Sequence, residues 1–172
     1  MTNPYLDETG QYRPLQMSDA ALASPAYAAA RRSWAATNAG AREAWIAGWS
    51  PEGCIEDPVG PSMFDPEGAG HRGTERLLEF WEKAVATPDH IEFRFDRGIA
   101  AGDELLCTGT MRTHMGENIM DIDIAVDYRV DSDGRLVSLR AFWEQEVALT
   151  SGLRPLTDDD KAAIAGALRK DN

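Results

Sequence analysis

The strongest constraint on the fold is an alternation of apolar and polar side chains in the second half of the chain. Between residues 119 and 130, the apolar positions are Met120, Ile122, Ile124, Val126, Tyr128 and Val130. The positions between them carry Asp121, Asp123, Ala125, Asp127 and Arg129. Because neighbouring side chains of a strand point to opposite faces, this segment predicts a strand with one apolar and one acidic face. The simplest interpretation is that the apolar face is core and the acidic face meets solvent.

Other elements are predicted around this strand. Further strands are expected at 91–95, 105–114 and 136–147, and helices at 26–39, 41–49, 74–86 and 157–169. Ser24-Pro25 supplies the cap and first residue of the first helix. Helices followed by antiparallel strands indicate an α+β fold, with a curved sheet that leaves a pocket beneath the helices. We expect an N-terminal arm (1–23), one domain (24–150) and a C-terminal helical extension (151–172).

Composition narrows the possible partners and location. The chain has 172 residues, is 43% hydrophobic and carries a net charge of −12. This balance argues against nucleic acid or an anionic membrane as the partner, because both require a basic face. An apolar small molecule remains compatible. Cys54 and Cys107 stand alone, and the N-terminal residues lack a signal-peptide pattern, so we expect a cytoplasmic protein.

Asp57 is the best candidate for a catalytic residue. It lies where a short predicted strand meets a long loop rich in proline and glycine, and Ile55, Pro58, Val59 and Pro61 surround it. A carboxylate among apolar groups is partly desolvated, which raises its pKa toward the value that a general base needs. The histidines (His71, His90 and His114) show no metal-ligand spacing, so we expect each to be structural or on the surface.

Two segments resemble bacterial Δ5-3-ketosteroid isomerases. Glu-Asp-Pro-Val-Gly at 56–60 is similar to the catalytic segment of that family. Val-Asp-Tyr-Arg-Val at 126–130 and the stretch from Asp133 to Trp143 are similar to its second acidic strand and return strand. The resemblance implies the cone-shaped fold shared with nuclear transport factor two, a homodimer, a steroid-like ligand and no cofactor.

The resemblance also implies roles for individual residues. Asp57 takes the place of the base and Asp127 that of the protonated acid that donates to the enolate oxygen. Pocket-lining positions fall on Val59, Phe80, Leu139, Ala141 and Trp143.

The chain departs from the family at three tyrosines. The tyrosine that donates to the enolate oxygen is replaced by Ser33, and two supporting tyrosines are replaced by Trp49 and Trp81, which are then expected to contact the ligand. Asp123 shares a predicted strand face with Asp127, and if that face points inward the cavity holds three acids. Three hypotheses therefore stay open: a steroid isomerase, another enzyme on the same fold (dehydratase, polyketide cyclase or epoxide hydrolase), and a non-catalytic domain that binds small molecules.

Overall fold

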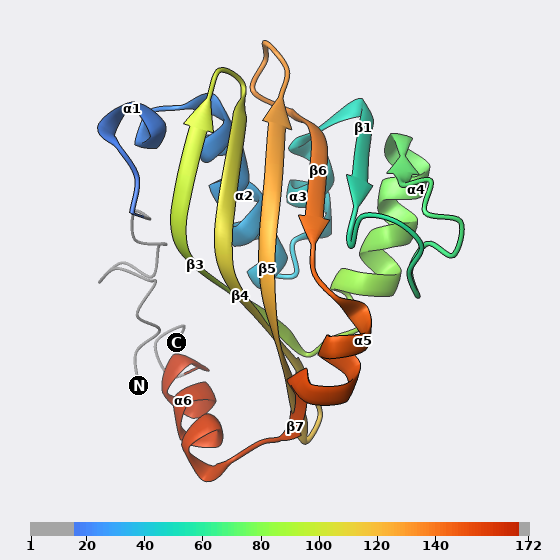
Figure 1. Cartoon of the computed structure of the whole chain (residues 1–172), viewed down its shortest axis with the longest axis vertical. Helices are drawn as coiled ribbons and strands as arrows, with labels where there is room; N and C mark the ends of the chain where they lie inside the picture. Colours follow the sequence, from blue (N-terminus) through green and yellow to red (C-terminus); the bar gives the residue numbers. More distant parts are fainter. Residues whose placement is uncertain (1–15, 169–172) are drawn as a thin grey trace.

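A curved sheet with helices on one face forms the body of the molecule (Figure 1). The computed structural model describes residues 16–168. The helices are α1 (Asp19–Leu22), α2 (Pro25–Asn38), α3 (Arg42–Ala47), α4 (Gly73–Phe80), α5 (Gln145–Val147) and α6 (Asp158–Leu168), with π-helical turns η1 (Trp81–Val85) and η2 (Ala148–Gly152). The strands are β1 (Trp49–Glu56), β2 (His71–Arg72), β3 (His90–Ala101), β4 (Glu104–Met115), β5 (Asn118–Val130), β6 (Leu136–Phe142) and β7 (Leu153–Pro155).

The strand order is β2-β1-β6-β5-β4-β3, and β7 pairs with β5 beside this path. All these strand pairs are antiparallel except β1 with β6. The chain thus forms the predicted α+β fold, a cone in which the curved sheet wraps around the N-terminal helices. None of the helices within residues 16–168 is long and apolar enough to cross a membrane.

The helix α2 begins and ends as its sequence predicts. The Ser24 hydroxyl accepts a hydrogen bond from the Tyr27 amide at 3.2 Å, and Pro25 occupies the first turn. Gly40, just beyond the helix, has a φ of +61°, a conformation that favours glycine. Alanines cover most of the buried side of α2. Because these side chains are small, the helix backbone lies close to the sheet, and Trp34 fills the space with its ring 5.0 Å from that of Phe95.

The structure corrects three predicted boundaries. The second helix ends at Ala47 because Trp49 already begins β1. The last long strand ends at Phe142, not at Val147, because β5 pairs with β7 instead of β6 beyond that point. Residues 145–152 form α5 and η2 between these two pairings. The predicted helix at 74–86 widens into the π-helical turn η1 after Phe80.

The predicted N-terminal arm and C-terminal extension both contain regular secondary structure. Most of the predicted N-terminal arm, residues 1–15, lies outside the described residues, but Ser18 caps the short helix α1 within it. The C-terminal extension adds β7 to the sheet and then forms α6. Thr157 and Asp160 bond to each other's backbone amides, at 2.9 and 3.2 Å, which is the reciprocal capping arrangement that begins such a helix.

Candidate active site

An apolar cavity of about 230 Å³ lies between the sheet and the helices. Its walls come from α2, η1, the loop after β1, and the inward faces of β3, β4, β5 and β6. Most lining side chains are aliphatic, aromatic or methionine, and they include Ile55, Phe64, Phe80, Ile91, Phe93, Met111, Met115, Met120, Ile122, Ile124, Val126 and Leu139. A wider hollow of about 430 Å³ on the outer face of the sheet is shallow and open to solvent. The enclosed apolar cavity is therefore the candidate site.

Among residues 16–168, Asp57 is the only carboxylate that lines this cavity. It follows the last residue of β1, and its Oδ1 accepts a hydrogen bond from Trp143 Nε1 at 2.6 Å. Burial raises the pKa of Asp57 from 3.8 to about 6, and the bond from Trp143 opposes part of that rise because it stabilises the charged form. A carboxyl group with this pKa exchanges protons readily near neutral pH.

The segment around Asp57 is fixed to β6 on both sides. Arg140 Nε donates to Glu56 Oε2 at 2.9 Å, and the Val59 amide donates to the Ala141 carbonyl at 2.8 Å. These contacts leave Asp57 between two anchored residues, with its carboxylate directed at Trp143. A base held in this way needs little reorganisation before it reacts.

Four of the predicted site residues line the cavity beside Asp57: Ser33, Phe80, Leu139 and Trp143. Four others do not line it, so the prediction that they belong to the cavity wall is corrected. Val59 contributes its backbone amide to the β6 contact, and Ala141 is fully buried within the sheet. Trp49 and Trp81 pack against the ring of Trp45, at centroid distances of 5.4 and 5.2 Å, and Trp45 lines the cavity in their place.

Asp127 lies outside the cavity, so its predicted place beside the base is wrong. The inward positions of β5 include Ile122, Ile124, Val126 and Tyr128, and all four line the cavity. Asp127 points to the outer face, and its backbone lies opposite that of Arg140 in the β5–β6 register. Val126 therefore occupies the place from which an acid would reach the cavity. The alternation of β5 had indicated this outcome, because Asp127 belongs to the acidic face and not to the apolar one.

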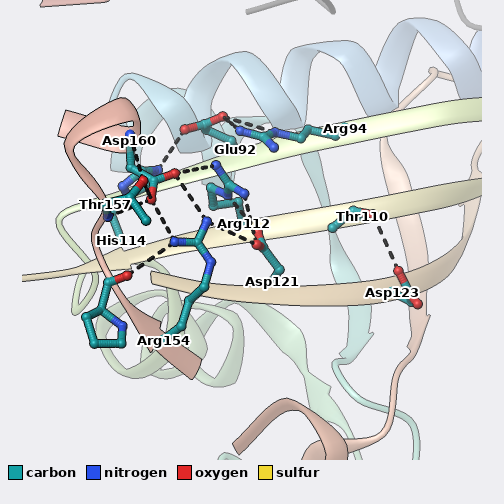
Figure 2. Close-up of polar contacts among 11 residues, drawn as sticks. Glu92, Arg94, Thr110, Arg112, His114, Asp121, Asp123, Arg154, Thr157 and Asp160 are labelled. Atoms are coloured by element: carbon teal, nitrogen blue, oxygen red, sulfur yellow. Dashed lines mark hydrogen bonds and ion pairs between the residues drawn. The ribbon is translucent and has the colours of Figure 1, made fainter. Parts of the chain in front are cut away.

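The other acids of β5 also face outward (Figure 2). Asp121 accepts two hydrogen bonds from Arg112, at 2.6 and 2.9 Å. Asp123 is exposed and lies next to Thr110. Arg112 and Arg154 link Asp121 to Asp160 at the start of α6, so the outer acidic face holds the C-terminal extension. Asp123 therefore adds no acid to the cavity.

Sequence reasoning missed several residues of the site. Tyr128 and Trp34 meet inside the fold, where the indole Nε1 of Trp34 donates to the Tyr128 hydroxyl at 2.8 Å. The cavity is also lined by six residues that the sequence did not single out: Thr113, Lys83, Met63, Met111, Met115 and Met120. Strand parity identifies Tyr128 and Met120 as inward residues. No local pattern, by contrast, shows that Met63 and Phe64 of the long loop fold back onto the cavity wall.

The lining favours proton chemistry at a single acid. Lys83 is the only basic side chain that the described part of the chain places on the cavity wall, and the described residues contain no group of three potential metal ligands among His, Cys, Asp and Glu. His71 is buried against the ring of Phe80 at a centroid distance of 5.2 Å and does not line the cavity. What the arrangement provides is one desolvated carboxylate in an apolar chamber, which suits general-base catalysis on an apolar ligand.

Fold and cavity together define a small α+β protein of the cone-shaped class. The model of the SnoaL-like domain matches residues 30–154, and the chain belongs to that family. Among curated proteins, none matches the sequence.

Solved structures with the same fold include enzymes of different kinds. The Mycobacterium tuberculosis protein RV0760c is 25% identical, with a TM-score of 0.69 over 76% of this chain and 96% of that one. A Δ5-3-ketosteroid isomerase from Mycobacterium sp. is 24% identical, with a TM-score of 0.68 over 76% and 98%. An LEH-like epoxide hydrolase from M. tuberculosis is 17% identical, with a TM-score of 0.59 over 83% and 96%. The fold is therefore shared by proteins with different activities.

Proposed function

We propose that this protein is an enzyme that uses Asp57 as a general base to move a proton on an apolar ketone. The observation that carries the proposal is the Asp57 carboxylate, which lines an apolar cavity, accepts a bond from Trp143 and has a pKa of about 6. At neutral pH such a group is largely ionised and can accept a proton. Its conjugate acid is strong enough to return that proton to another carbon.

The substrate must carry much of its own enolate stabilisation. With Asp127 on the outer face and Val126 facing the cavity, the predicted acid donor is missing from the lining that the described residues form. Ser33 lines the cavity and is the hydroxyl that replaces the expected tyrosine. The loss of one donor to a developing oxyanion costs about 3–4 kcal/mol. A conjugated or doubly activated ketone offsets that cost because its own π-system spreads the negative charge.

The isomerisation of a 3-oxo-Δ5 steroid or a similar β,γ-unsaturated ketone is the first activity to test. Its intermediate is a dienolate, so the charge extends over two double bonds, and its apolar rings suit the walls of the cavity. The resemblance of the segment around Asp57 to ketosteroid isomerases supports this choice, and the isomerase from Mycobacterium sp. has the same fold. We also expect a cytoplasmic homodimer, as that resemblance and the cysteine pattern imply.

A second candidate is the cyclisation of a polyketide-like substrate by an intramolecular aldol reaction. The inward position of Val126 and the serine at position 33 favour it. A β-dicarbonyl compound loses its proton more easily than a simple ketone, so a lone base is sufficient. The third class, epoxide hydrolysis, fits less well because it requires a group to protonate the epoxide oxygen besides the base that activates water.

Direct turnover measurements separate these candidates. The wild-type protein is assayed with 5-androstene-3,17-dione, a panel of β-dicarbonyl aldol substrates and a panel of epoxides. The Asp57→Asn variant keeps the shape of the side chain but cannot accept a proton at neutral pH. We expect it to lose about 10²–10⁴-fold in kcat/KM on the true substrate. The matched control is Asp123→Asn, an exposed acid on the outer face, which should retain full activity. Equal turnover by wild type and Asp57→Asn would refute the proposal.

A further inference from the structure

Thr113 carries a hydroxyl on the cavity wall, among methionine and isoleucine side chains. It lies on β4 between Met111 and Met115 on the inward face, and it pairs with Ile91 and Met120 across the neighbouring strands. Its side chain lines the cavity and the residue is only 5% exposed. Within residues 16–168 its hydroxyl has no hydrogen-bond partner, and its oxygen is not enclosed by packed protein, so it opens onto the cavity.

This placement is unfavourable for the protein alone. A buried hydroxyl that bonds to nothing loses its bonds to water without replacement. Valine has almost the same shape and would suit a wall of methionine and isoleucine better. The hydroxyl therefore gains from a partner inside the cavity, and a ligand oxygen can supply one.

Strand register gives the separation between the backbones of Thr113 and Trp143, whose indole bonds to the base. The Asp57 carboxylate bonds to Trp143, one residue beyond Phe142, which pairs with Ala125, and Ala125 pairs with Thr108 on β4. In this register, one position on β4 is level with Trp143, and Thr113 lies four residues beyond it. At 3.3 Å per residue, this is a distance of about 13 Å along the strand. Two strand spacings add about 10 Å sideways, so these two backbone positions are on the order of 16 Å apart.

A ligand that reaches both groups has a defined length. Because the side chains at both ends extend into the cavity and bond over about 3 Å, the gap left between the reacting carbon and the distal oxygen of the ligand is on the order of 10 Å. A fused polycyclic skeleton spans such a distance and keeps it fixed, because its rings do not rotate. A short ketone cannot touch both ends of the cavity.

We infer that Thr113 forms a distal polar subsite that binds a carbonyl or hydroxyl oxygen at the far end of an elongated polycyclic ketone. The bond sets how far the ligand enters and so which carbon lies beside Asp57. The identity of the reacting end rests on the proposed function, whereas the distal bond itself does not. Thr113 is in this sense a specificity residue that does not take part in proton transfer.

The test measures binding with two saturated ketones that cannot isomerise. Androstane-3,17-dione carries an oxygen at each end, and androstan-3-one lacks the distal one. Affinities are measured by equilibrium dialysis for the wild type, for Thr113→Val and for the control Thr87→Val. Thr87 also lines the cavity, but its hydroxyl already donates to the Glu82 carbonyl at 3.1 Å.

We expect the wild type and Thr87→Val to bind the dione about five- to tenfold more tightly than androstan-3-one. Thr113→Val should lose this preference and bind androstan-3-one at least as tightly as the wild type does. A wild-type protein without the preference, or a Thr113→Val variant that keeps it, would overturn the inference. Failure of both ketones to bind would overturn the ligand class.

These outcomes are separate from those of the turnover assays. A wild type that shows no distal preference, or a Thr113→Val variant that keeps it, overturns the subsite alone if Asp57-dependent turnover is intact. A clear preference without any turnover supports the subsite and contradicts the proposed reaction.

Discussion

Replacement of Asp57 by asparagine should stabilise the fold at alkaline pH while it abolishes catalysis. The pKa of Asp57 is raised from 3.8 to about 6 because burial disfavours the charged carboxylate. At about 1.36 kcal/mol for each tenfold change, an ionised Asp57 costs the folded state at most about 3 kcal/mol. The Asp57→Asn variant has no charge to bury, and its amide oxygen can still accept the bond from Trp143.

The stabilisation should depend on pH in a defined direction. A raised pKa means that the folded state binds a proton more tightly than the unfolded state between about pH 4 and pH 6. The contribution of Asp57 to stability is therefore complete below about pH 4 and is lost as the pH rises through about 6. Between about pH 8 and pH 5 the wild type should regain about 1.4 kcal/mol relative to Asp57→Asn.

Urea denaturation at about pH 8 and about pH 5 measures the effect. At the higher pH we expect the free energy of unfolding of Asp57→Asn to exceed that of the wild type by about 1–3 kcal/mol. The control Asp123→Asn removes an exposed acid and should change it by less than about 0.5 kcal/mol. If Asp57→Asn is no more stable than the wild type at the higher pH, or if its advantage is the same at the lower one, the carboxylate is not desolvated as described.

Three further results are expected. The kcat/KM of the wild type should rise with pH through a midpoint near 6 and level off above it, because only ionised Asp57 accepts a proton; a profile without a change near pH 6 would exclude Asp57 as the base. Trp143→Phe should move that midpoint upward, because it removes the donor that lowers the pKa of Asp57, and an unchanged or lower midpoint would contradict the role of the indole. Ser33→Ala should reduce turnover more than Asp127→Asn does in steady-state assays, since only Ser33 lines the cavity, and the opposite order would show that the outer face takes part in catalysis.

Much of the fold follows from local patterns. The alternation of β5 and the cap at Ser24 depend on residues close together in the sequence, and each forms as predicted. The apolar neighbours of Asp57 likewise indicate a desolvated carboxylate from sequence alone. Its partner Trp143 lies 86 residues away, and only the parallel pairing of β1 with β6 brings the two together.

The error at Asp127 shows that similarity between two sequences does not by itself determine the face of the strand to which a side chain points. The resemblance of residues 126–130 to ketosteroid isomerases suggested an acid in the cavity. A shift of one position along a strand, however, moves a side chain to the opposite face. Val126 and Tyr128 face the cavity and Asp127 does not, as the alternation of apolar residues requires.

The sequence by itself determined the class of fold, the position of the candidate base and the acidic outer face of β5, because each depends on periodicity or on adjacent residues. Tertiary structure alone decided which side chains share the cavity. Lys83, Thr113 and Met63 come from a π-helical turn, a strand and a loop that are far apart in the chain. These side chains reach the same cavity because of the curvature of the sheet and because β6 ends at Phe142. Both features result from packing over the whole domain and cannot be predicted from a local sequence pattern.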